Sequence, residues 1–317
     1  MSQNLKHFFV NLVKFLLFAM FVYLILLFAW GFLIPEGYQK NLKFVLGGQG
    51  HLFTRLQDAD TTRNVDILFL GTSHSYRGYD PRLFAEKGIC IFNLGSSSQA
   101  PEVSKRLLKK YIGSMNPKLV VFDVFPSQFA MDGIESKIDF VSNKRLLFPE
   151  DFALAFEGRN AKLINTYLFS LLYQTFEIYE NFKEQAIKKT GTYIQGGYVE
   201  SHNKKNKISD MFAPANLKAT DENLQILDSV CAILNQKGIP FILVQSPVSK
   251  AYYDHITNNA EWDSLFSHRG PYLNFNESLS LKDEYFYDAH HMNQAGVAIF
   301  DSVFLDKIQK QFISIKK

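Results

Sequence analysis

The chain has 317 residues, of which 47% are hydrophobic, 15% aromatic and 21% charged. This composition argues against intrinsic disorder and is typical of one large α/β domain with a membrane segment. The formal net charge of +3 is small and the densest basic run, residues 204–207, is short, so we expect no nucleic-acid partner. The two cysteines, Cys90 and Cys231, are expected to be small buried side chains, and a disulfide between them is left open. No Cys/His spacing resembles a zinc site, so neither a metal nor a cofactor is predicted.

The first predicted element is a membrane-spanning helix. Residues from Phe15 to Ile34 carry no charged side chain, and Pro35 ends the run. About 20 apolar residues is the length that crosses a bilayer as a helix. Residues 28–33 offer no Ala-x-Ala cleavage pattern, so an uncleaved anchor is favoured over a signal peptide.

The lysines that flank this helix do not set its orientation, because Lys6 and Lys14 precede it and Lys40 and Lys43 follow it. We expect residues 1–38 to form a short cytoplasmic tip and the anchor. The large domain is expected on the outer side of the cytoplasmic membrane, a preference that rests on the function inferred below. A cytosolic enzyme anchored the other way round is the alternative.

Residues 39–64 are predicted to be a connector, with a short helical turn near Leu52 to Gln57. The glycines at positions 47, 48 and 50 lack a strand-turn-helix context, so a phosphate-binding loop is a poor interpretation.

Residues 65–317 are predicted to form the main domain, an α/β three-layer sandwich around a central, mostly parallel five-stranded sheet. Strands and helices alternate, and the strands are continuously apolar, as in a parallel sheet covered on both faces. The predicted strands are Val65–Leu70, Ile89–Leu94, Leu119–Phe125, Pro240–Gln245 and, weakly, Glu284–Tyr287. The predicted helices are Pro81–Lys87, Pro101–Met115, Asp221–Lys237 and Asn293–Ile313.

An insertion at about residues 131–219 interrupts this alternation. Apolar side chains recur at helical spacing between Asn160 and Lys188, so a helical insertion is predicted. It is expected near the active edge of the sheet, as a lid or a substrate wall. Extra helices that only bury apolar surface are the equally weighted alternative.

Two segments far apart in the sequence carry residue types suited to acyl transfer. Ser73 follows the first strand directly after Gly71, and ligands bind at the carboxyl edge of such sheets. A serine hydroxyl needs a base, and the base needs a partner that fixes its tautomer. His291 is the predicted base and Asp288 its partner. His290 and His74 are alternative bases, and His74 is expected instead to shape the pocket.

The third candidate segment, residues 92–99, ends the second strand. Its glycine and small residues, Gly95 and Ser96 among them, let backbone N–H groups approach a developing oxyanion. A plain strand-to-helix turn is the alternative. Asn93, Gln99 and Gln128 are the candidates for a side-chain donor to the oxyanion, and the sequence does not choose among them.

With these residues the chain resembles the SGNH (GDSL-like) hydrolase superfamily from about Val65 to Ile313. Ser73 matches the nucleophile of the first block, Gly95 the glycine of the second block, and Asp288 and His291 the Asp-x-x-His of the last block. The resemblance implies a flavodoxin-like sheet and a Ser-His-Asp mechanism with a backbone donor at Gly95. Gly-Asp-Ser is replaced by Gly-Thr-Ser, and the Gly-x-Asn-Asp block is absent.

With a membrane anchor in front, the chain is similar to the teichoic acid D-alanyl transfer protein and to periplasmic polysaccharide O-acetyltransferases. This narrower resemblance implies a membrane-bound O-acyltransferase as donor and a cell-envelope polysaccharide as acceptor. A serine acyltransferase that moves an acyl group, with acetyl favoured, is therefore the first expectation. A carbohydrate esterase and a catalytically silent assembly component are the alternatives.

Overall fold

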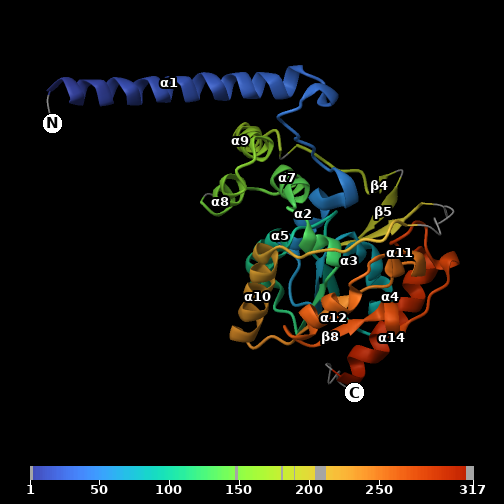
Figure 1. Ribbon diagram of the computed structural model, residues 1–317. Helices are drawn as coiled ribbons and strands as arrows, with labels where there is room; N and C mark the ends of the chain where they lie inside the picture. Colours follow the sequence, from blue (N-terminus) through green and yellow to red (C-terminus); the bar gives the residue numbers. More distant parts are fainter. Residues whose placement is uncertain (1–2, 147–148, 180, 189, 204–211, 312–317) are drawn as a thin grey trace. The chain divides into compact units, whose positions relative to one another are not determined.

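The computed structural model describes residues 3–146, 149–179, 181–188, 190–203 and 212–311 (Figure 1). The basic run at residues 204–207 lies outside these ranges. The chain divides into two compact units: unit 1 comprises residues 1–46 and 137–183, and unit 2 comprises residues 47–136 and 184–317.

Unit 2 is built on a five-stranded sheet with the order β2-β1-β3-β7-β8, in which all neighbours are parallel. Numbered along the sheet's own strands, this is the 2-1-3-4-5 order of doubly wound, flavodoxin-like folds. The predicted fold class is therefore confirmed. The five strands are β1 (Ile67–Gly71), β2 (Ile91–Asn93), β3 (Leu119–Asp123), β7 (Phe241–Gln245) and β8 (Tyr272–Asn274).

The predicted fifth strand, Glu284–Tyr287, is wrong. This segment holds the 3-10 turn η3 (Asp283–Tyr285), and the fifth strand is β8 instead. The sequence Tyr-Leu-Asn of β8 is short and half-buried, so it has neither an apolar run nor an alternation that would have marked it as a strand.

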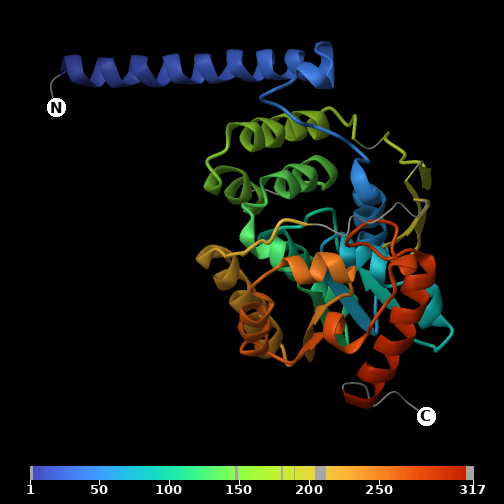
Figure 2. The same cartoon turned by 45° about the vertical axis from the view of Figure 1, so that its right-hand side comes forward.

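Helices cover both faces of the sheet (Figures 1 and 2). On one face, Phe69, Val121 and Val244 share a buried cluster with side chains of α14 (Gln294–Gln311). On the other, α5 (Pro101–Met115) packs against β1 and also against α10 (Asp221–Gln236). Burial on both faces explains why the central strands are continuously apolar.

The remaining helices of unit 2 are short and connect the strands. They are η2 (Gln49–His51), α2 (Leu52–Thr61), α3 (Ser73–Gly78), α4 (Pro81–Ala85), α6 (Pro126–Ala130), α11 (Lys250–His255), α12 (Asn259–Ser267) and α13 (Phe275–Ser278).

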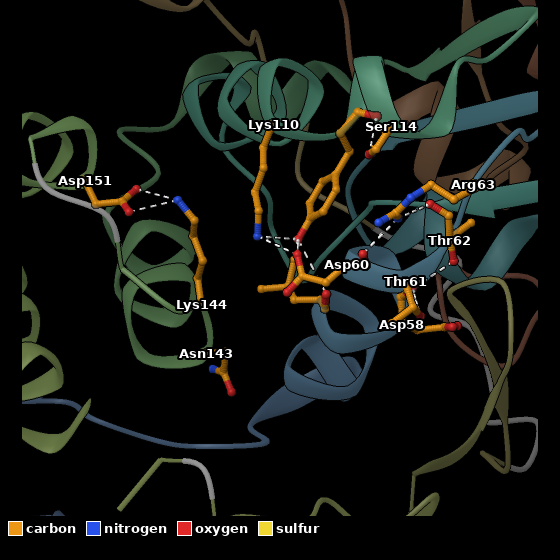
Figure 3. A network of polar contacts seen from close by, with 12 residues as sticks. Asp58, Asp60, Thr61, Thr62, Arg63, Lys110, Ser114, Asn143, Lys144 and Asp151 are labelled. Atoms are coloured by element: carbon orange, nitrogen blue, oxygen red, sulfur yellow. Dashed lines mark hydrogen bonds and ion pairs between the residues drawn. The ribbon is translucent and has the colours of Figure 1, made fainter. Parts of the chain in front are cut away.

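The predicted connector contains the full helix α2 rather than one short turn. Leu52, Phe53 and Leu56 of α2 are buried. Lys110 Nζ and Tyr111 OH of α5 both donate to Asp60 of α2, at 2.7 and 2.8 Å (Figure 3). Residues 47–64 are therefore part of the folded unit 2.

The insertion is only partly helical, which corrects the prediction. Helix α9 (Ala161–Thr175) ends well before Lys188, and Glu177 just beyond it has a positive φ of 57°. A small antiparallel sheet follows, in unit 2, and its β6 packs against α3. Strands of two to four residues give too weak a periodic signal to be found in the sequence. These strands are β4 (Ile187–Lys188), β5 (Gly191–Ile194) and β6 (Tyr198–Ser201).

Unit 1 combines the N-terminal helix with the helical part of the insertion. Helix α1 (Gln3–Leu33) is, among the described residues, the one helix long and apolar enough to cross a membrane. It packs against α9. Lys144 and Asp151, buried near α7 and in α8, form an ion pair at 2.8 Å (Figure 3). The other helices here are η1 (Glu36–Tyr38), α7 (Ile134–Asn143) and α8 (Glu150–Glu157).

Both cysteines are free. Cys231 is buried in α10 as predicted, whereas Cys90 is exposed. Cys90 stands just before β2, an edge strand of the sheet, and its side chain is exposed although the flanking Ile89 and Ile91 are buried.

Candidate active site

The turn after β1 presents Ser73 at the carboxyl edge of the sheet. Gly71 has a φ of 139°, and a Cβ there would lie 2.6 Å from the Asp123 carbonyl oxygen, so the turn requires glycine. Thr72 is the N-cap of α3, and its Oγ1 accepts the His74 N–H at 3.3 Å. Because Thr72 takes the capping role, the hydroxyl of Ser73 is left for other contacts.

The loop between η3 and α14 presents His291. An antiparallel bridge between Phe286 and Met292 closes the base of this loop. Inside it, Asp288 Oδ1 accepts the N–H groups of His290 and His291 at 3.0 and 2.8 Å. Asp288 thus shapes the loop as well as facing the ring of His291.

The structure brings Ser73, His291 and Asp288 together as one chain of polar contacts. His291 Nε2 lies 2.8 Å from Ser73 Oγ, and His291 Nδ1 lies 2.9 Å from Asp288 Oδ2. This is the geometry that a nucleophile, a base and an orienting carboxylate require.

The environment keeps Asp288 ionised. Burial raises the pKa of its carboxyl, but the hydrogen bond from His291, the neighbouring histidine charges and the His290 N–H outweigh burial and lower the pKa to about 2. An anionic Asp288 stabilises a proton on His291 Nδ1 and leaves Nε2 to accept the serine proton.

His74 and His290 lie behind this chain of contacts. His74 Nε2 is 3.3 Å from His290 Nδ1, and His74 Nδ1 is 3.0 Å from Thr72 Oγ1. Burial and the nearby histidine charges lower the pKa of His74 well below its usual range and that of His290 to about 4. His290 therefore faces His74 rather than Ser73. The position of its ring does not suit it to be the base for the Ser73 hydroxyl.

These three histidines are also the group, within the described residues, that could hold a metal ion. His74, His290 and His291 each bring a ring nitrogen within 4.8 Å of the others. The sequence predicts no metal site because no Cys/His spacing in it resembles one. His74 is more than 200 residues from the other two histidines. On His291, Nδ1 faces Asp288 and Nε2 faces Ser73, so a metal bound there would compete with one of these two contacts.

The predicted oxyanion donor Gly95 is already engaged. Its N–H donates to Asn93 Oδ1 at 2.8 Å. Asn93 is fully buried, and its Nδ2 donates to the Ser75 carbonyl oxygen at 2.8 Å. Gly95 fits tightly against the turn that carries Ser73, since a Cβ there would lie 2.9 Å from the Thr72 carbonyl oxygen. Asn93 and Gly95 therefore fix the turn that carries Ser73.

The other candidate donors are likewise structural. Gln99 Nε2 donates to the Leu94 carbonyl oxygen at 2.9 Å and to Ser96 Oγ at 3.0 Å. Gln128 Nε2 donates to the Gln99 carbonyl oxygen at 2.6 Å. The side-chain amides proposed from the sequence thus hold the loop after the second strand, and the Ser73 N–H at the start of α3 remains as the donor nearest to the Ser73 hydroxyl.

Asp123, at the end of β3, is a buried group that the sequence analysis did not assign. Tyr79 OH donates to its Oδ2 at 3.0 Å, and Ser246 Oγ donates to the same oxygen. Burial raises the pKa of Asp123 to about 7, although the two hydroxyl donors oppose the shift. The sequence did carry a signal for Asp123, a carboxylate that ends an otherwise fully apolar strand.

Asp123 should make stability depend on pH. Between the unfolded pKa of 3.8 and the folded pKa of about 7 only the folded state keeps the proton, so stability falls as pH rises through this window. Asparagine does not titrate, so the unfolding free energy of Asp123→Asn should rise relative to that of the wild type as the pH is raised. We expect this difference to grow by about 3 kcal/mol between about pH 5 and about pH 8. Thermal unfolding of both proteins in detergent measures it, and a constant difference would contradict the raised pKa.

Half-buried aromatic side chains stand beside the histidines. Tyr252 has its ring centroid 5.3 Å from that of His290, Phe125 stacks on Tyr252 at 6.1 Å, and Phe212 contacts Tyr252 at 5.7 Å. We call Phe125, Phe212 and Tyr252 the aromatic wall. Phe212 belongs to the insertion, so the insertion contributes to the surroundings of the site within unit 2.

No protein-family model and no curated protein matches this sequence. Among solved structures, the chain is similar to a GDSL-like lipase from Bacteroides thetaiotaomicron, with 12% identity, 81% of this chain and 97% of that chain covered, and a TM-score of 0.41. It is also similar to the lipase/acylhydrolase from Enterococcus faecalis, with 10% identity, coverage of 81% and 100%, and a TM-score of 0.39. Likeness at this level carries no argument about activity, so the chemistry must be inferred from the geometry of Ser73, His291 and Asp288.

Proposed function

We propose that this protein is a membrane-anchored serine acyltransferase. The observation that carries the proposal is the continuous chain Ser73 Oγ, His291 Nε2, His291 Nδ1 and Asp288 Oδ2 at the carboxyl edge of the sheet. The resemblance of the same residues to the SGNH pattern supports it.

In the first half-reaction Ser73 Oγ bonds to the acyl carbon while its proton moves to His291 Nε2. The donor's leaving group departs with that proton, and an acyl-serine ester remains. In the second half-reaction an acceptor hydroxyl gives its proton to His291 and attacks the ester. Ser73 Oγ then leaves and regains the proton, so no net proton is consumed.

The tetrahedral oxyanion needs donors close to Ser73. The Ser73 N–H is one of them. The Gly95 N–H joins it only if it exchanges Asn93 Oδ1 for the substrate oxygen, which the 2.8 Å bond between them opposes. With the Gly95 N–H engaged by Asn93, the site suits an activated acyl donor more than an unactivated ester.

The acceptor we propose is a hydroxyl of a cell-envelope polysaccharide. The aromatic wall supports this class, because the apolar faces of sugar rings pack on aromatic side chains. With α1 as an anchor, the catalytic unit would lie on the outer side of the cytoplasmic membrane, within reach of a membrane-bound O-acyltransferase that supplies the acyl group.

The deciding experiment incubates the full chain in detergent with p-nitrophenyl acetate and an acetylatable oligosaccharide. Intact-mass spectrometry follows the acylated protein and the acyl-sugar product together. An acetyl group on Ser73 that is transferred to the sugar faster than it is hydrolysed by water supports the transferase. Rapid loss to water supports the esterase alternative. No mark with excess donor points to a silent component or to one that accepts only from its membrane partner.

The aromatic wall gives a separable prediction. Tyr252→Ala should raise the KM for the oligosaccharide about tenfold, because it removes binding that is equal in the ground and transition states. Turnover of p-nitrophenyl acetate in the absence of sugar should stay within about twofold. Steady-state kinetics with both substrates test this, and equal losses on both would show that Tyr252 supports the histidines instead.

A further inference from the structure

Helix α1 is longer than a bilayer is thick. Its 31 residues extend about 46 Å, whereas the hydrocarbon core is about 30 Å. A span that began at Gln3 would put Lys14 near the bilayer centre, which is costly. A span from Phe15 to Ile34 contains no charge. The second placement is favoured, so the last third of α1 lies within the membrane.

Helix α9 packs on that last third. The Phe169 ring contacts the rings of Phe28 and Phe32 at 5.5 and 5.6 Å. A Cβ at Gly31 would collide with the Phe169 ring, so the two helices are in close contact there. In Figure 1 α1 is seen from the side and α9 nearly end-on, so the axes of the two helices cross. A helix that crosses a membrane span runs closer to the plane of the membrane.

The composition of α9 suits apolar surroundings. From Leu163 to Phe176 it carries no charged side chain, and Phe176 is 60% exposed. The amide and hydroxyl side chains in this stretch, the tyrosines apart, all donate to backbone carbonyl groups of unit 1, as a lipid environment requires. These side chains are Asn165, Thr166, Ser170, Gln174 and Thr175.

A basic cleft follows α1 directly. It has a volume of about 430 Å³, and its lining includes Lys40, Lys43, Lys162 and one acid, Glu36. We call it the lysine cleft. With α1 placed from Phe15 to Ile34, the cleft falls at the level of the lipid headgroups, where lysines attract phosphate.

We propose that unit 1 is seated in the membrane, with α9 inside the bilayer boundary beside α1 and the lysine cleft bound to the phosphate of a phospholipid headgroup. The inference rests on the anchor role of α1 in the proposed function. In this proposal the helical part of the insertion binds the membrane, a role different from the lid and from the plain core helices expected from the sequence.

Depth measurements on the full chain test the seating of α9. In a Cys90→Ser, Cys231→Ala background, spin labels are attached at Phe176→Cys, at Leu17→Cys as the lipid reference and at Lys237→Cys as the aqueous reference. In vesicles of phosphatidylcholine and phosphatidylglycerol, oxygen and a water-soluble nickel complex report accessibility. Thr175→Cys serves as a second probe if Phe176→Cys fails to fold.

We expect the label on α9 to be at least fivefold more accessible to oxygen, relative to nickel, than the label at position 237. If the label on α9 is as accessible to nickel as the label at position 237, while the label at position 17 is in lipid, the seating of α9 is wrong but the anchor role of α1 stands. A label at position 17 that behaves like water overturns the anchor as well, so the two failures are distinguishable.

The lysine cleft is tested on the full chain in detergent by native mass spectrometry with dioctanoyl phosphatidylglycerol, dioctanoylglycerol and inorganic phosphate. We expect retention of the phospholipid only, reduced at least tenfold by a triple glutamine substitution of Lys40, Lys43 and Lys162. The control replaces the exposed Lys87, Lys109 and Lys237 with glutamine and should bind as the wild type does. Equal retention of dioctanoylglycerol, tight binding of phosphate alone, or no effect of the triple substitution would overturn the headgroup site.

Discussion

Ser73→Ala should lower the rate of acyl-enzyme formation by about 1,000-fold or more, because the atom that bonds to the acyl carbon is removed. The fold should survive, since Thr72 and not Ser73 caps α3, and Ser73 Oγ makes its contact with His291 alone among the described residues. We expect a change in unfolding free energy within about 1 kcal/mol.

Burst kinetics with p-nitrophenyl acetate and intact-mass spectrometry measure the loss. Ser229→Ala is the matched control, because Ser229 is exposed on α10 and, within the described part of the chain, bonds only to the carbonyl oxygen of Gln225. An acyl mark that persists on Ser73→Ala at the wild-type rate would place the nucleophile elsewhere.

Asp288→Asn should lower kcat by about 1,000- to 10,000-fold while it leaves the loop intact. The Oδ1 of asparagine can still accept the N–H groups of His290 and His291. The amide group that replaces Oδ2, however, donates toward His291 Nδ1. It then favours the tautomer with the proton on Nε2, which cannot take the proton of Ser73.

The kinetics of Asp288→Asn are compared with those of Asp254→Asn, whose carboxylate pairs with Lys250 on an exposed face of α11. Circular dichroism checks that the fold is kept. Activity within tenfold of the wild type would mean that Asp288 only shapes the loop through its backbone contacts. In that case, another group would have to orient His291.

The sequence predicted the parts of the fold that have strong local signals. Four of the five sheet strands are continuous apolar runs, and α5, α10 and α14 have helical spacing and polar or proline starts. The fifth strand, β8, escaped because three half-buried residues carry no periodic pattern. The β4-β5-β6 sheet was missed for the same reason, since the pairing of short strands depends on partners and not on the strands themselves.

For the candidate site, too, some features could be predicted from the sequence and others could not. By itself, the sequence determined which residues have the right chemistry, because Ser73 follows a strand and Asp288 is three residues before His291. Only the tertiary structure decided their partners. It turned His290 toward His74, tied the Gly95 N–H to Asn93, and buried Asp123 under two hydroxyl groups. Residue type and local spacing can be read along the chain. Which hydrogen bonds those residues form, even the short-range one between Gly95 and Asn93, is decided only when the sheet brings its carboxyl edge together.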